Sequence, residues 1–475
     1  MPEPALQRIE QNPAMLRAFR MMTSMSRILL ASSLGVLLAA TPAVQARQTA
    51  KFDSQLAAET FDAAWLLVDE SPYAVRARGI DWDAVARRHR PTAARARNKD
   101  ELRQSIQAML DEIGESHFNL IPADAVDIAH SGKLEPVLSG FRDSGLVAGM
   151  VEGELAVLQV TPGSPAAIQG IQPGWRIERI NGRTMATALA EIEKLEPKAR
   201  RTAQMYFESA IADLLETSAQ ARKLKLELRD AQNRTQIREV VPAPATGELV
   251  NIPLLPPALF YLHQRRLALA DGGCLGLIRF NLWAPALNQA FPKALAEVRD
   301  CKAIAIDLRG NPGGVIGTAM GVGGYLVNEP TPLGYFSAGG ASARLPALPR
   351  RVSDDGKPLT PYSGKLAILL DGRSASTSEV FASGLQQAGR ATIIGTPSAG
   401  MALPSMMNTL PNGDRLLYAV ADLTAPNGQR LEGIGITPDI FAPNTFETLH
   451  AGQDATLRAL QQWLQADTVP TQETP

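Results

Sequence analysis

Residues 52–115 place their apolar side chains at the spacing of amphipathic helices. The segment "DELRQSIQAMLDEIG" aligns five of them on one helical face: Leu102, Ile106, Met109, Leu110 and Ile113. Asn98 with Glu101 resembles a capping box at the start of this helix, and Gly114 is typical of a helix end. The pattern predicts a helical N-terminal domain over residues 52–135.

The pattern changes between residues 138 and 242, where short β-like runs alternate with Gly and Pro turns. "SGLVAGMVEGELAVLQV" and "KLKLELRDAQNRTQIREVV" are two such stretches. A long helical segment from Thr184 to Ala221 interrupts them. We therefore expect a small β domain with a helical insertion.

Residues 255–445 alternate apolar runs of strand length with helical segments. The runs are "CLGLIRF", "CKAIAIDLRG", "KLAILLDG" and "RATIIG". This alternation predicts parallel strands joined by crossover helices. Residues 446–475 hold one more amphipathic helix, "GQDATLRALQQWLQ", and a polar tail. The predicted fold class is a multidomain α+β protein.

Composition narrows the functional classes. The chain has 475 residues, 45% of them apolar, with a formal net charge of -1. That length calls for two or three domains, and the balanced charge argues against nucleic acid as a partner. Five histidines are present, none paired at metal-ligand spacing: His89, His117, His130, His263 and His450. We therefore predict no metal site and no cofactor.

The N-terminus has the character of a targeting segment. From Met25 it is "MSRILLASSLGVLLAATPAVQA", with Arg27 before an apolar run that is too short to span a bilayer comfortably. We predict that residues 1–46 are a signal peptide cleaved after Ala46. The mature protein would then be periplasmic or secreted, without a stable membrane span. The alternative is an anchor that stays in place.

Two cysteines, Cys274 and Cys301, each begin an apolar strand-like run. If the two strands are parallel neighbours, their starts lie within disulfide range. An oxidising compartment would allow the bond. Two buried free thiols are the equal alternative.

The richest chemical signal is "DGRSASTSEVFASGLQQAGRATIIG", with Ser374, Ser376 and Ser378 at a predicted strand-to-helix turn. Such a turn can present a nucleophile at a positive helix N-terminus, but a serine there needs a base. Upstream, the glycine loop of "DLRGNPGG" could aim N–H groups at a developing negative charge. The loop lacks the lysine of a P-loop, and its alternative role is a tight turn.

The segment "PGSPAAIQGIQPGWRIERINGRTM" resembles a PDZ domain, although Trp175 stands where that family usually has aspartate. "SGLVAG" resembles the loop with which PDZ domains bind a peptide C-terminus. The resemblance implies a peptide-binding role for Ser144, Gly145, Leu146 and Val147. A β domain that serves only as a spacer is the alternative.

A PDZ-like segment, "DLRGNPGG" and "SASTSEVFASGLQQAGRATIIG" follow one another in the order found in the C-terminal processing (tail-specific) protease family. "GIDWDAVARRHRP" and "EGIGITPDI" are also family-like, so the resemblance covers nearly the whole mature chain. It implies a crotonase/ClpP-like core over residues 255–445 with Ser376 as nucleophile. It also implies an oxyanion hole formed by the N–H of Thr377 and of either Gly313 or Gly314.

The best-known branch of that family uses a Ser-Lys dyad, with lysine 25 residues beyond the nucleophile. Met401 occupies that position here, and Ser405 replaces the glutamine partner of the lysine. A second, tricorn-like branch uses a Ser-His-Ser-Glu tetrad. "EIGESHFNL" and "LEGIGITPDI" match its other segments and imply Ser116, His117 and Glu432 as catalytic partners of the nucleophile.

By spacing alone, His117 would be a surface residue at a helix end; the resemblance makes it the base. The predicted function is therefore a serine endopeptidase acting on polypeptides, with cleavage near C-termini as one mode. The alternative is an inactive relative that binds peptide tails. An acyl-CoA-handling crotonase shares the core fold but needs neither a PDZ-like insert nor a serine nucleophile.

Overall fold

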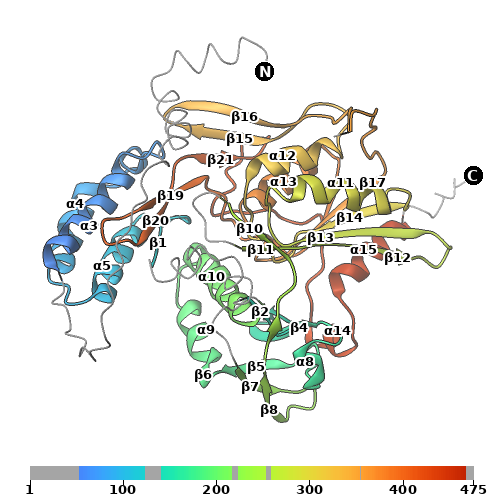
Figure 1. The fold of residues 1–475 in the computed structure, drawn as a ribbon, viewed down its shortest axis with the longest axis horizontal. Coiled ribbons are helices and arrows are strands. Elements are labelled where there is room, and N and C mark those ends of the chain that lie inside the picture. Colours follow the sequence, from blue (N-terminus) through green and yellow to red (C-terminus); the bar gives the residue numbers. More distant parts are fainter. Residues whose placement is uncertain (1–52, 123–140, 217–222, 253–257, 354, 467–475) are drawn as a thin grey trace, which may run out of the picture.

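The computed structural model describes residues 53–122, 141–216, 223–252, 258–353 and 355–466. The predicted signal segment 1–46, His130 and the tail after residue 466 lie outside these ranges. Helices and strands are mixed, in an N-terminal group of helices, a β-rich middle part and a larger helix-and-strand part (Figure 1). Every helix in the described ranges is too short or too polar to cross a membrane.

The N-terminal part consists of α3 (Ser54–Asp69), η1 (Val75–Arg78), α4 (Trp82–Ala94) and α5 (Lys99–Asp111). The five apolar residues predicted to share one helical face are all buried, which confirms the pattern. Asn98 caps α5 by accepting from the N–H of Glu101, whereas the Glu101 carboxylate accepts from the N–H of Arg97. The helices pack on a three-stranded sheet of β1 (Asn119–Ile121), β20 (Arg415–Ala419) and β19 (Ser405–Thr409).

The middle part is a sheet with the strand order β3 (Leu146–Val151), β4 (Glu154–Val160), β5 (Arg176–Ile180), β7 (Leu224–Arg229) and β8 (Thr235–Val240). Its smaller elements are α8 (Pro165–Ile168), β6 (Arg183–Thr184), and the paired β2 (Arg142–Asp143) and β9 (Ala243–Pro244). The helical insertion is two helices, α9 (Met185–Glu193) and α10 (Pro197–Glu216). Pro197 lacks the N–H that would continue α9, so the predicted helical segment is divided into two helices there.

The larger part is built on a six-stranded sheet in the order β12 (Leu262–Ala268), β13 (Cys274–Phe280), β14 (Ala303–Asp307), β17 (Lys365–Leu370), β18 (Thr392–Gly395) and β22 (Ile440–Phe441). Neighbours from β13 onward are parallel, as predicted, and β12 is antiparallel. One face is covered by α11 (Leu287–Val298), α12 (Ile316–Gly324) and α13 (Thr377–Gln387), and the other by α15 (Ala455–Ala466).

Alternation along β14 shows why both faces are covered. Ile304 and Ile306 join the core with α11, α12 and α13, while Ala303 and Ala305 join the core with α15. A strand that is apolar on both faces is stable only between two helix layers. The remaining elements are β10 (Glu248–Val250), β11 (Ala258–Phe260), β15 (Thr331–Ala338), β16 (Ala341–Ala347), β21 (Asp422–Thr424) and α14 (Phe446–His450).

Cys274 and Cys301 form a disulfide bond. Cys274 begins β13, Cys301 precedes β14, and Leu275 pairs with Ala303 across the two parallel strands. The geometry is the one expected of adjacent strand starts. Of the two alternatives left open by the sequence, the structure contains the bond.

Candidate active site

Ser376 lies between β17 and α13, at the turn predicted from the sequence. Its backbone has φ 54° and ψ -119°, a combination that is rare for a residue with a side chain. The residue is partly exposed. A sharp strand-to-helix turn of this kind holds a serine hydroxyl at the positive end of the helix.

The two neighbouring serines of the motif are fully buried. The Ser374 hydroxyl donates to the carbonyl of Leu308 at 2.9 Å. The Ser378 hydroxyl bonds Asn311 at 3.1 Å and accepts from the indole of Trp283 at 2.9 Å. Both hydroxyl groups are therefore used to hold the turn in place, and Ser376 is the serine of the three that remains open to a reagent.

The glycine loop passes directly over this turn. A Cβ on Gly313 would lie 2.7 Å from that of Ser376 and 3.0 Å from the nitrogen of Thr377, so only glycine permits the approach. The Gly313 N–H donates to the side chain of Asn311 at 2.9 Å. Within the described chain the N–H groups of Gly314 and Thr377 have no such partner. Of the two glycines considered, Gly314 is therefore the better candidate donor.

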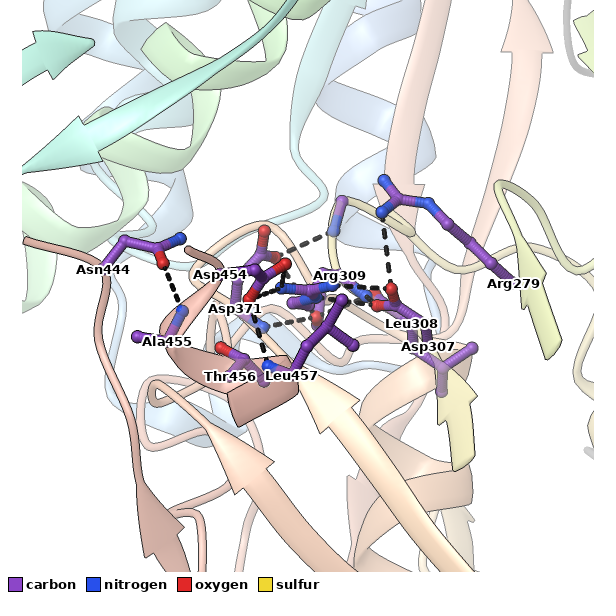
Figure 2. Close-up of polar contacts among 12 residues, drawn as sticks. Arg279, Asp307, Leu308, Arg309, Asp371, Asn444, Asp454, Ala455, Thr456 and Leu457 are labelled. Carbon is purple, nitrogen blue, oxygen red and sulfur yellow. Dashed lines mark hydrogen bonds and ion pairs between the residues drawn. The ribbon is translucent and has the colours of Figure 1, made fainter. Parts of the chain in front are cut away.

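A partly buried charge network anchors the start of the loop (Figure 2). Arg309 bonds the carboxylate of Asp307 at 2.8 and 2.9 Å and that of Asp454 at 2.8 and 2.9 Å. Burial alone would raise the pKa of Asp307, but guanidinium groups, Arg309 foremost, outweigh it and hold the pKa at about 2. Asp371 accepts from the N–H of Gly310 at 2.9 Å. These bonds tie the loop to α15 and to the turn after β17.

His117 follows α5 and has φ 61°, and its Nδ1 lies 2.6 Å from the Ser116 hydroxyl. The same hydroxyl donates to Oε2 of Glu432 at 2.9 Å. Since a hydroxyl has one hydrogen and Glu432 receives it, Ser116 must accept from Nδ1–H. This bonding selects the tautomer in which Nε2 carries the lone pair, as a general base requires.

Glu432 is buried and held by three donors. Its Oε1 accepts from the N–H of Ser116, and its Oε2 accepts from the N–H of Ala402, both at 2.8 Å. Burial raises the pKa of Glu432, and the two N–H donors oppose that rise. Burial also lowers the pKa of His117 to about 4, which keeps the imidazole neutral at physiological pH. The structure thus brings three of the four predicted catalytic residues into one hydrogen-bonded chain.

The fourth, Ser376, is joined to this chain through the backbone at Met401. The N–H of Ser376 donates to the Met401 carbonyl at 2.8 Å, and the next residue, Ala402, donates to Glu432. The Met401 side chain is buried against Met205, Ala375 and Ala399. At the position where the dyad branch has lysine, this chain therefore offers backbone atoms and an apolar side chain.

Glu379 is a residue whose role the sequence reasoning missed. It is the acid that ends "SASTSE", and in the structure its buried carboxylate bonds both the Ser376 turn and the segment around Met401. The available signal was its place three residues after Ser376, which is the capping-box spacing.

The predicted peptide-binding residues lie at the start of β3, an edge strand. The N–H of Ser144 donates to the carbonyl of Leu215 in α10 at 3.1 Å. That of Gly145 donates to Asp143 at 2.6 Å, and that of Leu146 to the Ser144 hydroxyl at 3.2 Å. Val147 pairs with Gln159 of β4. A peptide carboxylate at this loop would have to replace the first three bonds.

The other described histidines lie apart from this site. His89 contacts Glu112 at 2.5 Å, His450 contacts the carbonyl of Gly174 at 3.0 Å, and His263 is on the edge strand β12. Across the described ranges no group of three His, Cys, Asp or Glu side chains is arranged to hold a metal ion.

Comparison with known proteins identifies the family. Residues 274–442 match "Peptidase family S41", and residues 55–111 match "Tricorn protease C1 domain". The chain therefore contains a peptidase family S41 domain and a segment similar to the tricorn C1 domain. Its S41 segment begins at β13 and ends just after β22, so it holds the glycine loop, the Ser376 turn and Glu432. Ser116 and His117 lie outside both matched segments.

Two curated relatives are carboxy-terminal processing proteases. That of Bartonella bacilliformis is 32% identical over 200 residues, which cover 39% of this chain and 42% of the relative. CtpB of Bacillus subtilis is 21% identical over 308 residues, 64% of this chain and 55% of the relative. This S41 chain thus spans about half the length of the two relatives.

Solved structures share the fold. The photosystem II D1 C-terminal processing protease aligns with a TM-score of 0.54 at 20% identity, covering 87% of this chain and 98% of that one. Mature CPAF aligns with a TM-score of 0.58 at 13% identity, covering 87% and 99%. The S41 fold, with its N-terminal helical segment, therefore extends over most of the chain.

Proposed function

We propose that this S41 protein is a serine endopeptidase that hydrolyses polypeptides through a Ser-His-Ser-Glu tetrad. The observation that carries the proposal is the bonded chain from Glu432 through Ser116 to Nδ1 of His117, which leaves Nε2 as a base. A neutral imidazole in that tautomer is what a serine nucleophile needs and what a lone surface histidine would lack.

In the proposed reaction, Nε2 of His117 takes the proton of the Ser376 hydroxyl while Oγ attacks the scissile carbonyl. Glu432, acting through Ser116, stabilises the imidazolium that forms. The N–H groups of Gly314 and Thr377 receive the oxyanion. The imidazolium then protonates the leaving amine, and a water deprotonated by His117 releases the acyl group from Ser376.

We further propose that the β3–β8 sheet is a PDZ-like domain and that the sheet from β12 to β22 is a crotonase/ClpP-like core. Residues 144–147 would bind the C-terminal carboxylate of a substrate, so that cleavage falls near C-termini. A peptide with a free carboxylate should then bind more tightly than the same peptide with an amidated end. Equal binding of the two would leave the domain as a spacer.

A periplasmic or secreted location is also a proposal. The apolar segment before Ala46 has the pattern of a signal peptide, and the Cys274–Cys301 bond suits an oxidising compartment.

The test of the function is labelling of the protein with a fluorophosphonate, which reacts with activated serines whatever the peptide preference. Ser376→Ala should abolish both labelling and casein hydrolysis with the fold intact by circular dichroism. Ser342→Ala is the matched control, because this serine is exposed on β16 and its hydroxyl takes no part in holding the Ser376 turn. Labelling that survives in Ser376→Ala would contradict the proposal.

A further inference from the structure

Glu379 is fully buried in the first turn of α13, and its carboxylate accepts four hydrogen bonds. Oε1 accepts from the Ser398 hydroxyl at 2.6 Å and from the N–H of Gly400 at 2.7 Å. Oε2 accepts from the N–H groups of Met401 and Ser376, both at 3.0 Å. A first-turn acid that bonds the N-cap N–H is an ordinary helix cap, but the other three bonds reach a different segment of the chain.

That segment is shared by two buried carboxylates. The consecutive N–H groups of Gly400 and Met401 donate to Glu379, and the next one, of Ala402, donates to Glu432. Glu432 in turn sets the tautomer of His117 through Ser116. The position of the nucleophile turn and that of the base are therefore fixed from the same three backbone groups.

The Ser376 end of this arrangement needs external support. The positive φ of Ser376 is unfavourable for a residue with a side chain, so the surrounding bonds must impose it. Its N–H is shared between Oε2 of Glu379 and the carbonyl of Met401. Both partners hold the Ser376 backbone against residues 398–402.

We propose that Glu379 is a positioning residue, which holds Ser376 in register with the Glu432–Ser116–His117 chain through the backbone of residues 398–402. The inference rests on the proposed serine peptidase function. Burial raises the pKa of Glu379 to about 7, although its four hydrogen-bond donors act to lower it. The carboxylate is therefore ionised at the alkaline pH of the assay below.

The discriminating variant is Glu379→Gln, which keeps the shape of the side chain. In one orientation the glutamine oxygen accepts from the N–H groups of Ser376 and Met401. Its NH2 group then faces the N–H of Gly400 and the Ser398 hydroxyl. That hydroxyl already accepts from the N–H of Ile436. If the amide is turned round, NH2 faces two N–H groups. Each orientation opposes donors and loosens the link to residues 398–402.

Asp230→Asn is the matched control. Asp230 is also a buried carboxylate with four hydrogen bonds, from Gln232, Arg234 (two) and Gln236, at the tip of the β7–β8 hairpin. In Figure 1 that hairpin lies far from the turn that begins α13. The same chemical change is thus made away from the site.

Both variants and the wild type are compared at pH 8.5, at a temperature where all three are folded by circular dichroism. The readouts are the second-order rate of fluorophosphonate labelling, and kcat and KM for a fluorogenic peptide that the wild type cleaves. We expect Glu379→Gln to lower the labelling rate and kcat at least tenfold, with KM changed less than threefold. Asp230→Asn should lower the melting temperature but leave labelling within twofold of wild type.

A folded Glu379→Gln that labels within threefold of wild type would overturn the inference, as would an equal loss in Asp230→Asn. Should Glu379→Gln not fold, Ser398→Ala carries the test, because it removes one donor to Glu379 and is expected to slow labelling several-fold. A wild-type rate in that variant overturns the inference. A wild-type protein that labels nowhere would instead overturn the proposed function, and the inference with it.

Discussion

Glu432→Gln most directly perturbs the link between the Glu432 carboxylate and the proposed base, His117. The wild-type carboxylate accepts from the N–H of Ser116, the N–H of Ala402 and the Ser116 hydroxyl. A glutamine has one acceptor oxygen, so it can accept from the donors on only one side of the former carboxylate. If its oxygen faces the Ser116 hydroxyl, its NH2 group faces the N–H of Ser116. If its oxygen faces the N–H of Ser116, its NH2 group faces the N–H of Ala402 and donates to the Ser116 hydroxyl. Ser116 would then donate to Nδ1 and leave Nε2 of His117 protonated, the wrong tautomer for a base.

The expected loss can be estimated from the two bonds that link Glu432 to His117. Oε2 lies no more than about 5.5 Å from Nδ1, which at an effective dielectric constant of about 20 corresponds to about 3 kcal/mol of attraction to the imidazolium. Loss of that charge alone should reduce kcat/KM roughly a hundredfold. The fraction of molecules in the wrong tautomer adds to the loss. The opposed donors should also lower the free energy of unfolding by about 1–3 kcal/mol.

The assay is a double-mutant cycle with Ser116→Ala, read as kcat/KM and as the fluorophosphonate labelling rate of folded protein. The loss caused by the wrong tautomer requires the Ser116 hydroxyl, so it should disappear in the Ser116→Ala background and leave only the roughly hundredfold loss due to the Glu432 charge. Fully additive losses would show that the tautomer contributes nothing and that Glu432 acts through its charge alone. A single Glu432→Gln variant within threefold of wild type would refute the electrostatic reasoning altogether.

The other predictions concern the base and the disulfide. His117→Ala should lower kcat/KM about a thousandfold or more, whereas Met401→Ala, which keeps its backbone bonds, should lose less than about tenfold; the reverse order would exclude His117 as the base. An unperturbed imidazole would give a rise in kcat/KM across about pH 6 to 7, but burial lowers the pKa of His117, so the acid limb that His117 sets should have its midpoint below about pH 5.5. This limb is read in Glu379→Gln, because protonation of Glu379 in the wild type would add a separate limb near pH 7; a midpoint near 6.5 in that variant would contradict the His117 shift. Replacing Cys274 and Cys301 by alanine should cost up to about 3.5 kcal/mol in chemical denaturation, since the bond closes a separation of 27 residues, and two alkylatable thiols in the unreduced wild type would show that it does not form.

Local patterns predicted most of the fold because most elements bury one regular set of positions. The runs that became β13, β14, β17 and β18 are apolar on successive residues, as strands covered on both faces must be. The β15–β16 hairpin was not predicted, since Pro332 and Pro346 argue against strands although they lie opposite each other in the pair. The insertion after Thr184 was predicted as a helical segment without an internal boundary, because its composition stays helical up to Pro197, where the structure begins a second helix.

The candidate site was less accessible to such reasoning. The contact between Ser116 and Glu432 joins residues 316 apart, and no periodicity indicates it; a family resemblance was needed to pair them. Glu379 has the spacing of a helix cap, yet its bonds to Ser398, Gly400 and Met401 exist only because a distant loop folds back on α13. Patterns specify which face of an element is buried, but they do not specify which loop covers it.

Because Met401 stands where the dyad branch has lysine, the proposed base must come from another part of the chain than Ser376. A lysine base would come from the same S41 segment as Ser376, the proposed nucleophile, whereas His117, the proposed base, comes from the N-terminal helical part. That part is held by apolar packing of α3, α4 and α5 on β19 and β20 and on Leu403, which directly follows the backbone groups bound by Glu379 and Glu432. Residues 398–403 therefore contact the Ser376 turn on one side and the layer that carries His117, the proposed base, on the other. Loosening the N-terminal helices should consequently lower the reactivity of Ser376 even while the six-stranded sheet stays folded, because proton transfer requires the two parts to be in register.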